Sequence, residues 1–196
     1  MVFDTIEDKL RALAECGFRL KDQFTVADLV QSWGREALDK PGFDLALVCL
    51  GMTQEGPPWT SHCENLWHFD TECIEGDGSY VSIGKRLTEM AQGSLPLSEF
   101  EDHVDIDGGI AWLRFKCRGE TVRVDCVVED DWVDSGVFGA FVDQLAKHDP
   151  NKLFVYYDLG GQDCIIGCTT RDQFSKLRNL VPAAKPLTCG GKTGQV

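Results

Sequence analysis

One stretch, from Phe100 to Val128, constrains the fold more than any other part of the chain. Apolar residues alternate with mostly polar ones from Ala111 to Cys117, and the alternation resumes from Val122 to Val128. This period of two is typical of strands that bury one face and expose the other. The stretch therefore predicts a three-stranded β-meander whose inward side chains belong to a core.

Two turn sequences predict the register of this meander. Asp107-Gly108 lies between the first two strands. Gly119-Glu120 suits a two-residue II′ loop between the second and third, because glycine adopts a positive φ without a steric penalty. The facing pairs that follow are Val104 with Ala111, Cys117 with Val122, Phe115 with Val124 and Leu113 with Cys126.

Capping residues followed by apolar residues at helical spacing predict five helices. The predicted helices cover residues 4–17, 25–38, 79–92, 135–147 and 170–180. The two capping boxes that the spacing predicts are Asp4 with Glu7 and Thr170 with Gln173.

Four further strands are predicted outside the meander. The run 43–51 is almost continuously apolar, which is typical of a strand buried on both faces. The others cover residues 66–75, 152–158 and 164–168, and Gly160-Gly161 joins the last two as a hairpin. The mixture of helices and hairpins predicts an α+β fold, with a mainly antiparallel sheet, a central meander at about residues 100–128 and helices packed on it.

No linker or repeat divides the chain, and its 196 residues suit one globular domain. We expect that domain to cover residues 1–186, since Pro182 and Pro186 end the last helix. Residues 187–196 are expected to be a mobile C-terminal tail.

The chain is strongly acidic: 19 basic against 32 acidic residues give a net charge of −13. Such a field repels nucleic-acid phosphates and attracts basic partners, although solubility alone would also account for it. No apolar run reaches the ~20 residues of a membrane span, and the N-terminus lacks the regions of a signal peptide. The nine cysteines are an odd number without the density of a disulfide scaffold. We therefore expect a reduced, cytoplasmic protein that binds neither nucleic acid nor membrane.

His68, Asp70 and Glu72 share one face of the predicted strand 66–75. There, Asp70 and Glu72 would lie about 7 Å apart, close to the separation that paired carboxylates need in acid–base catalysis. A solvated outer face of an antiparallel sheet has the same pattern, and we favour it. The cross-strand partners available to these acids are Arg114, Lys116 and Arg123. The face remains a candidate partner-binding site.

Cysteine and histidine residues around this strand suggest two further kinds of site. A Cys63–His68–Asp70 arrangement would supply a nucleophile, a base and an orienting carboxylate. A zinc ion could be held by His62, Cys63, His68 and Cys73. Their spacing matches no zinc motif, and His68 and Cys73 fall on opposite strand faces. We favour structural roles for these residues and expect neither a metal nor a cofactor.

An acidic run lies between the meander and the next helix. It consists of Glu129, Asp130, Asp131, Trp132, Val133 and Asp134. A hard cation is not favoured, because the alternating ligands and central glycine of an EF-hand are missing. Acids just before a helix are favoured by the helix dipole, which explains most of the run. A docking role remains, with Trp132 as an aromatic anchor among charges.

The stretches LWHFDTECIEGDGSY (66–80) and YYDLGGQDCIIGCTT (156–170) resemble segments of uncharacterised bacterial proteins. Some of those proteins are similar to immunity proteins of polymorphic toxin systems, and the resemblance extends over the C-terminal two-thirds of the chain. It carries no catalytic motif. What it implies is a cytoplasmic inhibitor that binds a cognate toxin domain and blocks its active site.

Our first hypothesis is therefore a non-enzymatic acidic protein that binds a protein partner, a cognate toxin domain with a basic surface. The predicted contact residues are His68, Asp70, Glu72, Glu129, Asp130, Asp131, Trp132 and Asp134. The alternative hypothesis is a small hydrolase-like or metal-dependent enzyme that uses Asp70 and Glu72, or Cys63 and His68. A structural or adaptor module in a larger assembly is a third hypothesis.

Overall fold

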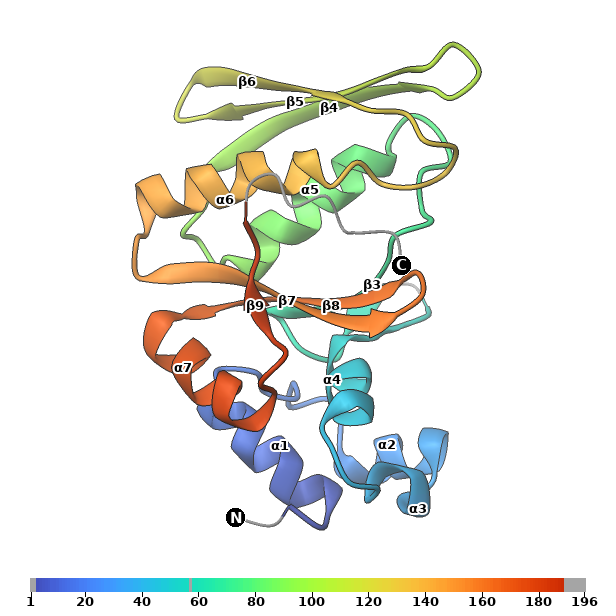
Figure 1. The fold of residues 1–196 in the computed structure, drawn as a ribbon, viewed down its shortest axis with the longest axis vertical. Helices are drawn as coiled ribbons and strands as arrows, with labels where there is room; N and C mark the ends of the chain where they lie inside the picture. The colour runs from blue at the N-terminus through green and yellow to red at the C-terminus, as the bar shows by residue number, and fades with distance from the viewer. Residues whose placement is uncertain (1–2, 57, 189–196) are drawn as a thin grey trace. The chain divides into compact units, whose positions relative to one another are not determined.

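The computed structural model describes residues 3–56 and 58–188, and Figure 1 shows their elements as a ribbon. Over these residues the chain forms seven helices and nine strands, which are arranged in three sheets. The small ribbon and both hairpins of the meander are antiparallel. The predicted α+β fold with mainly antiparallel sheets is therefore confirmed.

Four helices come first along the chain, and strands and helices are mixed after them. The helices are α1 (Ile6–Glu15), α2 (Val26–Trp33), α3 (Arg35–Leu38), α4 (Asp44–Gly51), α5 (Ser79–Met90), α6 (Gly136–His148) and α7 (Arg171–Leu180). The strands are β1 (Thr53–Gln54), β2 (Thr60–Ser61), β3 (Leu66–Asp70), β4 (Leu97–Asp105), β5 (Ile110–Cys117), β6 (Glu120–Cys126), β7 (Lys152–Gly160), β8 (Asp163–Thr170) and β9 (Lys185–Pro186).

The described residues divide into two units. The first contains residues 3–56, 58–69 and 154–185, and the second contains residues 70–153 and 186–188. The single domain expected over residues 1–186 stays a prediction. Most of the expected tail at 187–196 lies outside the described residues, so its mobility also stays a prediction.

In the first unit, a four-stranded sheet has helices packed on one face. The strand order is β3-β8-β7-β9. Figure 1 shows α1, α4 and α7 on the same face of this sheet. The predicted hairpin between β7 and β8 is present, and Gly160 and Gly161 at its turn adopt φ angles of 86° and 68°. These left-handed angles explain why glycine stands at both positions.

Helix α4 occupies the apolar run 43–51, so the prediction of a buried strand there is wrong. A continuous apolar run has no period, and it suits a helix that is buried on all sides as well as a strand. Leu47 and Leu50 are both almost completely buried. A Cβ atom on Gly51 would lie 2.5 Å from the backbone nitrogen of His68, so glycine is what allows α4 to approach β3.

Two helices in the first unit begin or end differently from the prediction. Helix α1 is capped by Thr5, whose hydroxyl oxygen accepts from the backbone N–H of Asp8, so the N-cap lies one residue after the predicted Asp4. The helix predicted over 25–38 is interrupted, because Gly34 adopts a φ of 79° between α2 and α3. The capping box of Thr170 with Gln173 at the start of α7 is confirmed.

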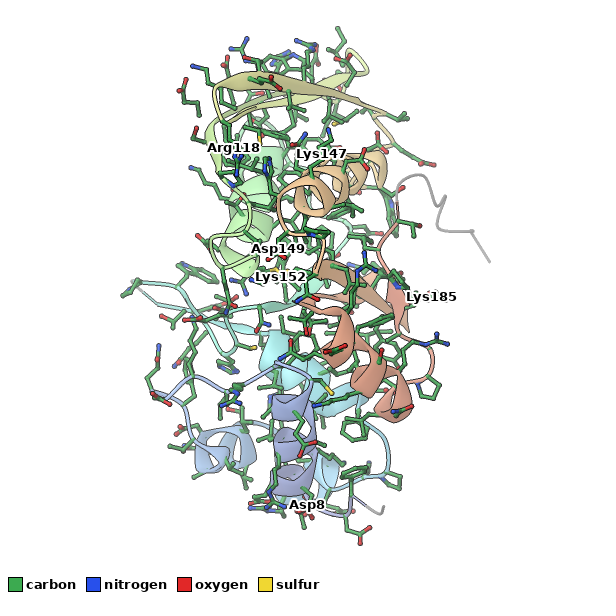
Figure 2. The ribbon with its side chains drawn as sticks, turned by 90° about the vertical axis from the view of Figure 1, so that its left-hand side faces the viewer. Asp8, Arg118, Lys147, Asp149, Lys152 and Lys185 are labelled. Carbon is green, nitrogen blue, oxygen red and sulfur yellow. The ribbon has the colours of Figure 1, made fainter. Side chains whose placement is uncertain are left out.

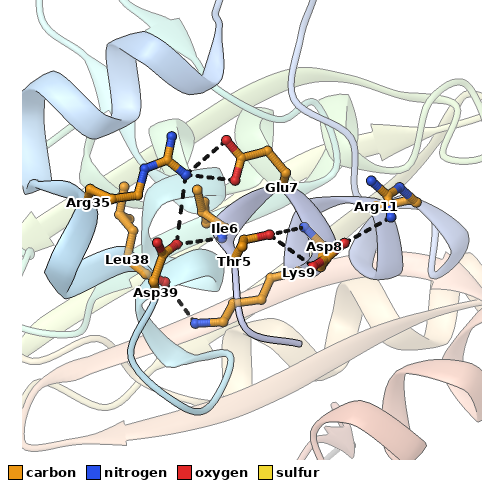
Figure 3. Close-up of polar contacts among 9 residues, drawn as sticks. All are labelled: Thr5, Ile6, Glu7, Asp8, Lys9, Arg11, Arg35, Leu38 and Asp39. Carbon is orange, nitrogen blue, oxygen red and sulfur yellow. Dashed lines mark hydrogen bonds and ion pairs between the residues drawn. The ribbon is translucent and has the colours of Figure 1, made fainter. Parts of the chain in front are cut away.

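A polar network joins α1 to α3 and to the segment that follows α3 (Figure 3). Nη1 of Arg35 donates to both carboxylate oxygens of Glu7, at 2.7 and 2.9 Å. Lys9 is only 2% exposed, and its ammonium donates to the backbone carbonyl of Leu38 at 2.7 Å. Backbone acceptors of this kind make burial of a lysine tolerable, because an unbonded ammonium away from water is costly.

In the second unit, the predicted meander is present as β4, β5 and β6. Figure 1 shows α5 and α6 covering one face of this sheet. Leu113 and Phe115 are completely buried on that face, and the ring of Phe115 stacks on Phe141 of α6 with ring centroids 5.2 Å apart. A Cβ atom on Gly84 would lie 2.8 Å from the ring of Phe100, so glycine lets α5 pack closely.

The register of the meander is correct in one hairpin and displaced in the other. Val104 lies opposite Ala111, as predicted. Cys117 lies opposite Glu120 rather than Val122, and the other predicted pairs of this hairpin are wrong by the same two residues. The loop is Arg118-Gly119, whose φ angles of 50° and 88° suit a type I′ turn. A displacement of two residues leaves every side chain on its predicted face.

Candidate functional site

The strand that was expected to carry a polar face is shorter than predicted. β3 ends at Asp70 rather than at residue 75. His68 belongs to the first unit, whereas Asp70 and Glu72 belong to the second. Because Glu72 lies beyond the end of β3, the prediction that these three residues share a strand face is wrong.

Beyond Asp70, the chain pairs with the acidic run. The N–H of Val133 donates to the carbonyl of Thr71 at 2.8 Å, and the N–H of Ile74 donates to the carbonyl of Asp131 at 2.9 Å. Between these two bonds, Glu72 and Trp132 form an antiparallel bridge. Two stretches that were separate candidates in the sequence are therefore neighbours in the structure.

We call the surface that these stretches form the acidic patch. It consists of Asp70, Glu72, Glu75, Glu129, Asp130, Asp131 and Trp132. Burial raises the pKa of the Cys73 thiol to about 12, and the negative charges of Asp70, Asp131 and Glu75 contribute to that increase. Carboxylates from both stretches therefore raise the pKa of the same thiol, that of Cys73. This is expected from the backbone pairing of the two stretches.

Most acids of the patch lack a counter-charge among the residues that the structure describes. No ion pair between the described residues includes Glu72, Glu129, Asp130 or Asp131. The carboxylate of Asp70 accepts the N–H of Glu72 at 2.9 Å, which fixes the turn that leaves β3. Like charges held this close repel one another, so a cation from outside the chain would relieve the repulsion.

Trp132 stands in the middle of these carboxylates and is 39% exposed. Its N–H donates to the carbonyl of Glu129 at 3.1 Å, which closes a turn around Asp130 and Asp131. Asp130 adopts a φ of 54°, a left-handed angle that aspartate tolerates better than most residues. The turn presents two acids and one aromatic ring to solvent.

Two other acids of the second unit bind backbone amides instead of facing a partner. The carboxylate of Asp134 accepts from the N–H of Val127 and from the N–H of Gly136, each at 2.8 Å. The carboxylate of Asp102 accepts from the N–H of Gly78 at 2.7 Å and that of Val81 at 2.9 Å, and it thereby caps α5. Asp134, a predicted contact residue, is therefore engaged within the fold.

The outer face of the meander also holds a tryptophan among charges. The guanidinium groups of Arg123 and Arg114 lie 4.6 and 5.7 Å from the ring centroid of Trp112. Each cation of this face has an acid beside it: the pairs are Arg114 with Glu101, Lys116 with Glu99 and Arg123 with Asp125. These three cations were available as partners of Asp70 and Glu72 in the sequence analysis, and in the structure they pair with acids of β4 and β6.

The cysteine and histidine residues of the first unit have other partners than the catalytic or metal hypotheses require. Cys63 is completely buried, and its thiol lies 3.3 Å from Oδ1 of Asn65. Nε2 of His68 lies 3.5 Å from a carboxylate oxygen of Asp163. Nδ1 of His62 lies 2.7 Å from the carbonyl of Cys49. Within the described part of the chain, no group of three or more His, Cys, Asp or Glu side chains is arranged to hold a metal ion.

The structure forms a cysteine–histidine pair that sequence reasoning missed. Sγ of Cys117, at the end of β5, lies 3.0 Å from Nε2 of His148, at the end of α6. The two residues are 31 positions apart, on a strand and a helix. No motif marks such a pair in the sequence, although the alternation that places Cys117 on the inward face was visible.

An open groove in the first unit is a second feature that the sequence did not indicate. It has a volume of about 670 Å³ and is lined by α2, β1 and the residues around them. Its aromatic and apolar lining includes Phe24, Trp33, Met52 and His62. The ring of His62 packs on Phe24 with ring centroids 4.4 Å apart. The groove is lined by both polar and apolar groups, with no cluster of convergent charges.

Comparisons of the chain with protein-family models, with curated proteins and with solved structures found no significant match. Within residues 3–56 and 58–188, no helix combines the length and the apolar character that crossing a membrane requires.

Proposed function

We propose that the chain is a non-enzymatic acidic binding protein whose acidic patch docks on a basic surface of a partner protein. One observation carries this proposal: carboxylates from two distant stretches gather around the exposed Trp132. Glu72, Glu129, Asp130 and Asp131 enter no ion pair between described residues.

Such a surface has the physical properties of a docking site for cations. A net charge of −13 attracts a basic partner over several ångströms and accelerates encounter. At contact, an exposed indole supplies apolar area and a π face for arginine or lysine. Tryptophan is among the residues that most often dominate binding energy at interfaces.

We propose further that the partner is a toxin domain and that the protein neutralises it in the cytoplasm. The support is the resemblance of residues 66–80 and 156–170 to bacterial proteins similar to immunity proteins. The first of these stretches contains Asp70, Glu72 and Glu75, so the resembling segment and the acidic patch overlap. An inhibitor of this class needs no catalytic group, because occupying a basic active site is sufficient.

The test is recovery of the tagged protein from its native lysate, with bound proteins identified by mass spectrometry. Wild type is compared with a patch variant, Asp130→Asn with Asp131→Asn, in which asparagine keeps the left-handed angle of Asp130 accessible. The matched control is Glu101→Gln with Asp125→Asn, which removes the same charge from the ion-paired face of the meander. We expect wild type and control to retain one stoichiometric partner that the patch variant loses.

Two results would contradict the proposal. Equal recovery of the partner by the patch variant would remove the acidic patch from the interface. If no protein is recovered with wild type, the binding class itself fails, and the enzymatic alternative through Asp70 and Glu72 or Cys63 and His68 is tested next by substrate screening. If a partner is found, restoration of growth in cells that co-express both proteins tests the toxin assignment separately.

A further inference from the structure

Cys117 and His148 form a thiol–imidazole pair in the second unit, away from the acidic patch. Their Sγ and Nε2 atoms are 3.0 Å apart, which is short for a contact that involves sulfur. Cys117 is 6% exposed, and His148 is half-buried. An imidazole in direct contact with a thiol can take its proton, and the thiolate is the nucleophilic form of cysteine.

Four of the other seven described cysteines provide a contrast. Burial raises the pKa of the Cys16 thiol to about 11 and that of the Cys49, Cys73 and Cys126 thiols to about 12. Carboxylates near Cys73 and Cys126 act in the same direction as burial. Those thiols are held protonated at neutral pH, and protonated buried thiols are poorly reactive.

The pair lies at the ends of two elements, where residues of both charges are near it in the chain, and Glu120 lies opposite Cys117 across the hairpin. Arg118 follows Cys117 in the hairpin loop, and Lys147 precedes His148 in the last turn of α6. Figure 2 shows both cations at this end of the second unit. The carboxylate next to the pair in sequence, that of Asp149, is engaged by the hydroxyl of Ser94 at 2.7 Å. A small reagent can reach the pair from the half-buried side of His148.

We propose that Cys117, paired with His148, is an oxidation site at which hydroperoxides modify this thiol in preference to the other described cysteines. The Cys117 thiolate attacks one peroxide oxygen, so an S–O bond forms and the O–O bond breaks. The leaving hydroxide, or alkoxide from an organic hydroperoxide, takes the proton that His148 received from the thiol. Sulfur is oxidised by two electrons to a sulfenic acid, and the peroxide is reduced to water or an alcohol. The inference does not depend on the proposed binding function.

The experiment uses the full chain with Cys189→Ser, which leaves only cysteines from the described part of the sequence. The folded protein is treated with hydrogen peroxide, quenched, unfolded and alkylated, and mass spectrometry gives the unreacted fraction of each cysteine. We expect Cys117 to be oxidised roughly tenfold faster than any other described thiol, a modest part of what general acid–base assistance supplies. His148→Gln should remove most of this advantage, and the neighbouring Lys147→Gln should keep it.

Two outcomes would overturn the proposal. One is oxidation of Cys117 no faster than that of another described cysteine in the protein that retains His148, a result that does not depend on whether the variant folds. The other is a folded His148→Gln protein, verified by circular dichroism, in which Cys117 is oxidised at the unchanged rate.

Discussion

Two tryptophans of the second unit stand among charges, and their surroundings differ. Trp112, on the outer face of the meander, lies beside Arg114 and Arg123, and each of these cations has an acid beside it. Trp132, in the acidic patch, lies in a turn with Asp130 and Asp131, neither of which joins an ion pair between described residues.

The difference separates a solvated face from a docking face. On the meander, opposite charges neutralise one another and the arginines already lie over the indole. A cation from a partner would therefore gain little binding free energy there. In the acidic patch, no ion pair between described residues relieves the repulsion among Glu72, Glu129, Asp130 and Asp131, so an external cation would relieve it. Acidic composition alone would not distinguish these regions, but the pairing of each charge does.

The largest effect that we predict concerns the acids that the fold uses. Asp134→Ala should lower the free energy of unfolding by about 2 kcal/mol, because the amides of Val127 and Gly136 lose a charged acceptor. Asp130→Asn should change it by less than about 0.5 kcal/mol, as expected for a surface substitution. Urea denaturation measures both, and equal losses would show that the structural and docking acids have not been distinguished correctly.

A smaller effect is expected at the two tryptophans. Trp132→Ala should weaken binding of a fluorescent oligo-arginine peptide several-fold, since an exposed cation–π contact contributes about 0.5–1 kcal/mol. Trp112→Ala should leave the affinity unchanged, because Arg123 and Arg114 already lie over that ring. Fluorescence anisotropy at low salt gives both affinities, and the reverse ranking would assign docking to the meander face.

The smallest effect is expected on the ion-paired face. Glu101→Gln breaks the pair with Arg114, in which both side chains are about half exposed, and should change the free energy of unfolding by less than about 0.5 kcal/mol. Solvent screens such pairs and ordering the side chains costs entropy. A loss above about 1 kcal/mol would mean that this face is a tightly coupled network rather than a solvated surface.

The meander could be predicted from the sequence because its evidence was local. Alternation assigned Leu113 and Phe115 to the buried face correctly. The register of the second hairpin was wrong, because a glycine turn can use residues 118–119 or 119–120 and both choices preserve the faces. The prediction of a strand over residues 43–51 was wrong for a related reason. Without a hydrophobic period, length and composition could not distinguish a buried helix from a strand.

The candidate site was predictable residue by residue, but not as an arrangement. Alternation and charge singled out Glu72 and Trp132 separately, and the backbone bridge between them is a long-range contact that no local pattern indicates. The same limit applies to Cys117 and His148, which come together only because α6 packs on the meander. Asp134 was placed with the docking acids because its two backbone partners were not visible in the sequence.

The most direct test of the central claim compares charge-matched variants for binding of the oligo-arginine peptide. The proteins are wild type, Asp130→Asn with Asp131→Asn, and Glu101→Gln with Asp125→Asn, each measured by anisotropy at low and at physiological salt. We predict that the patch variant binds roughly tenfold more weakly than wild type at low salt, and that the control stays within about twofold. Equal weakening in both variants would contradict the account, because binding would then follow the net charge of the chain rather than the acidic patch.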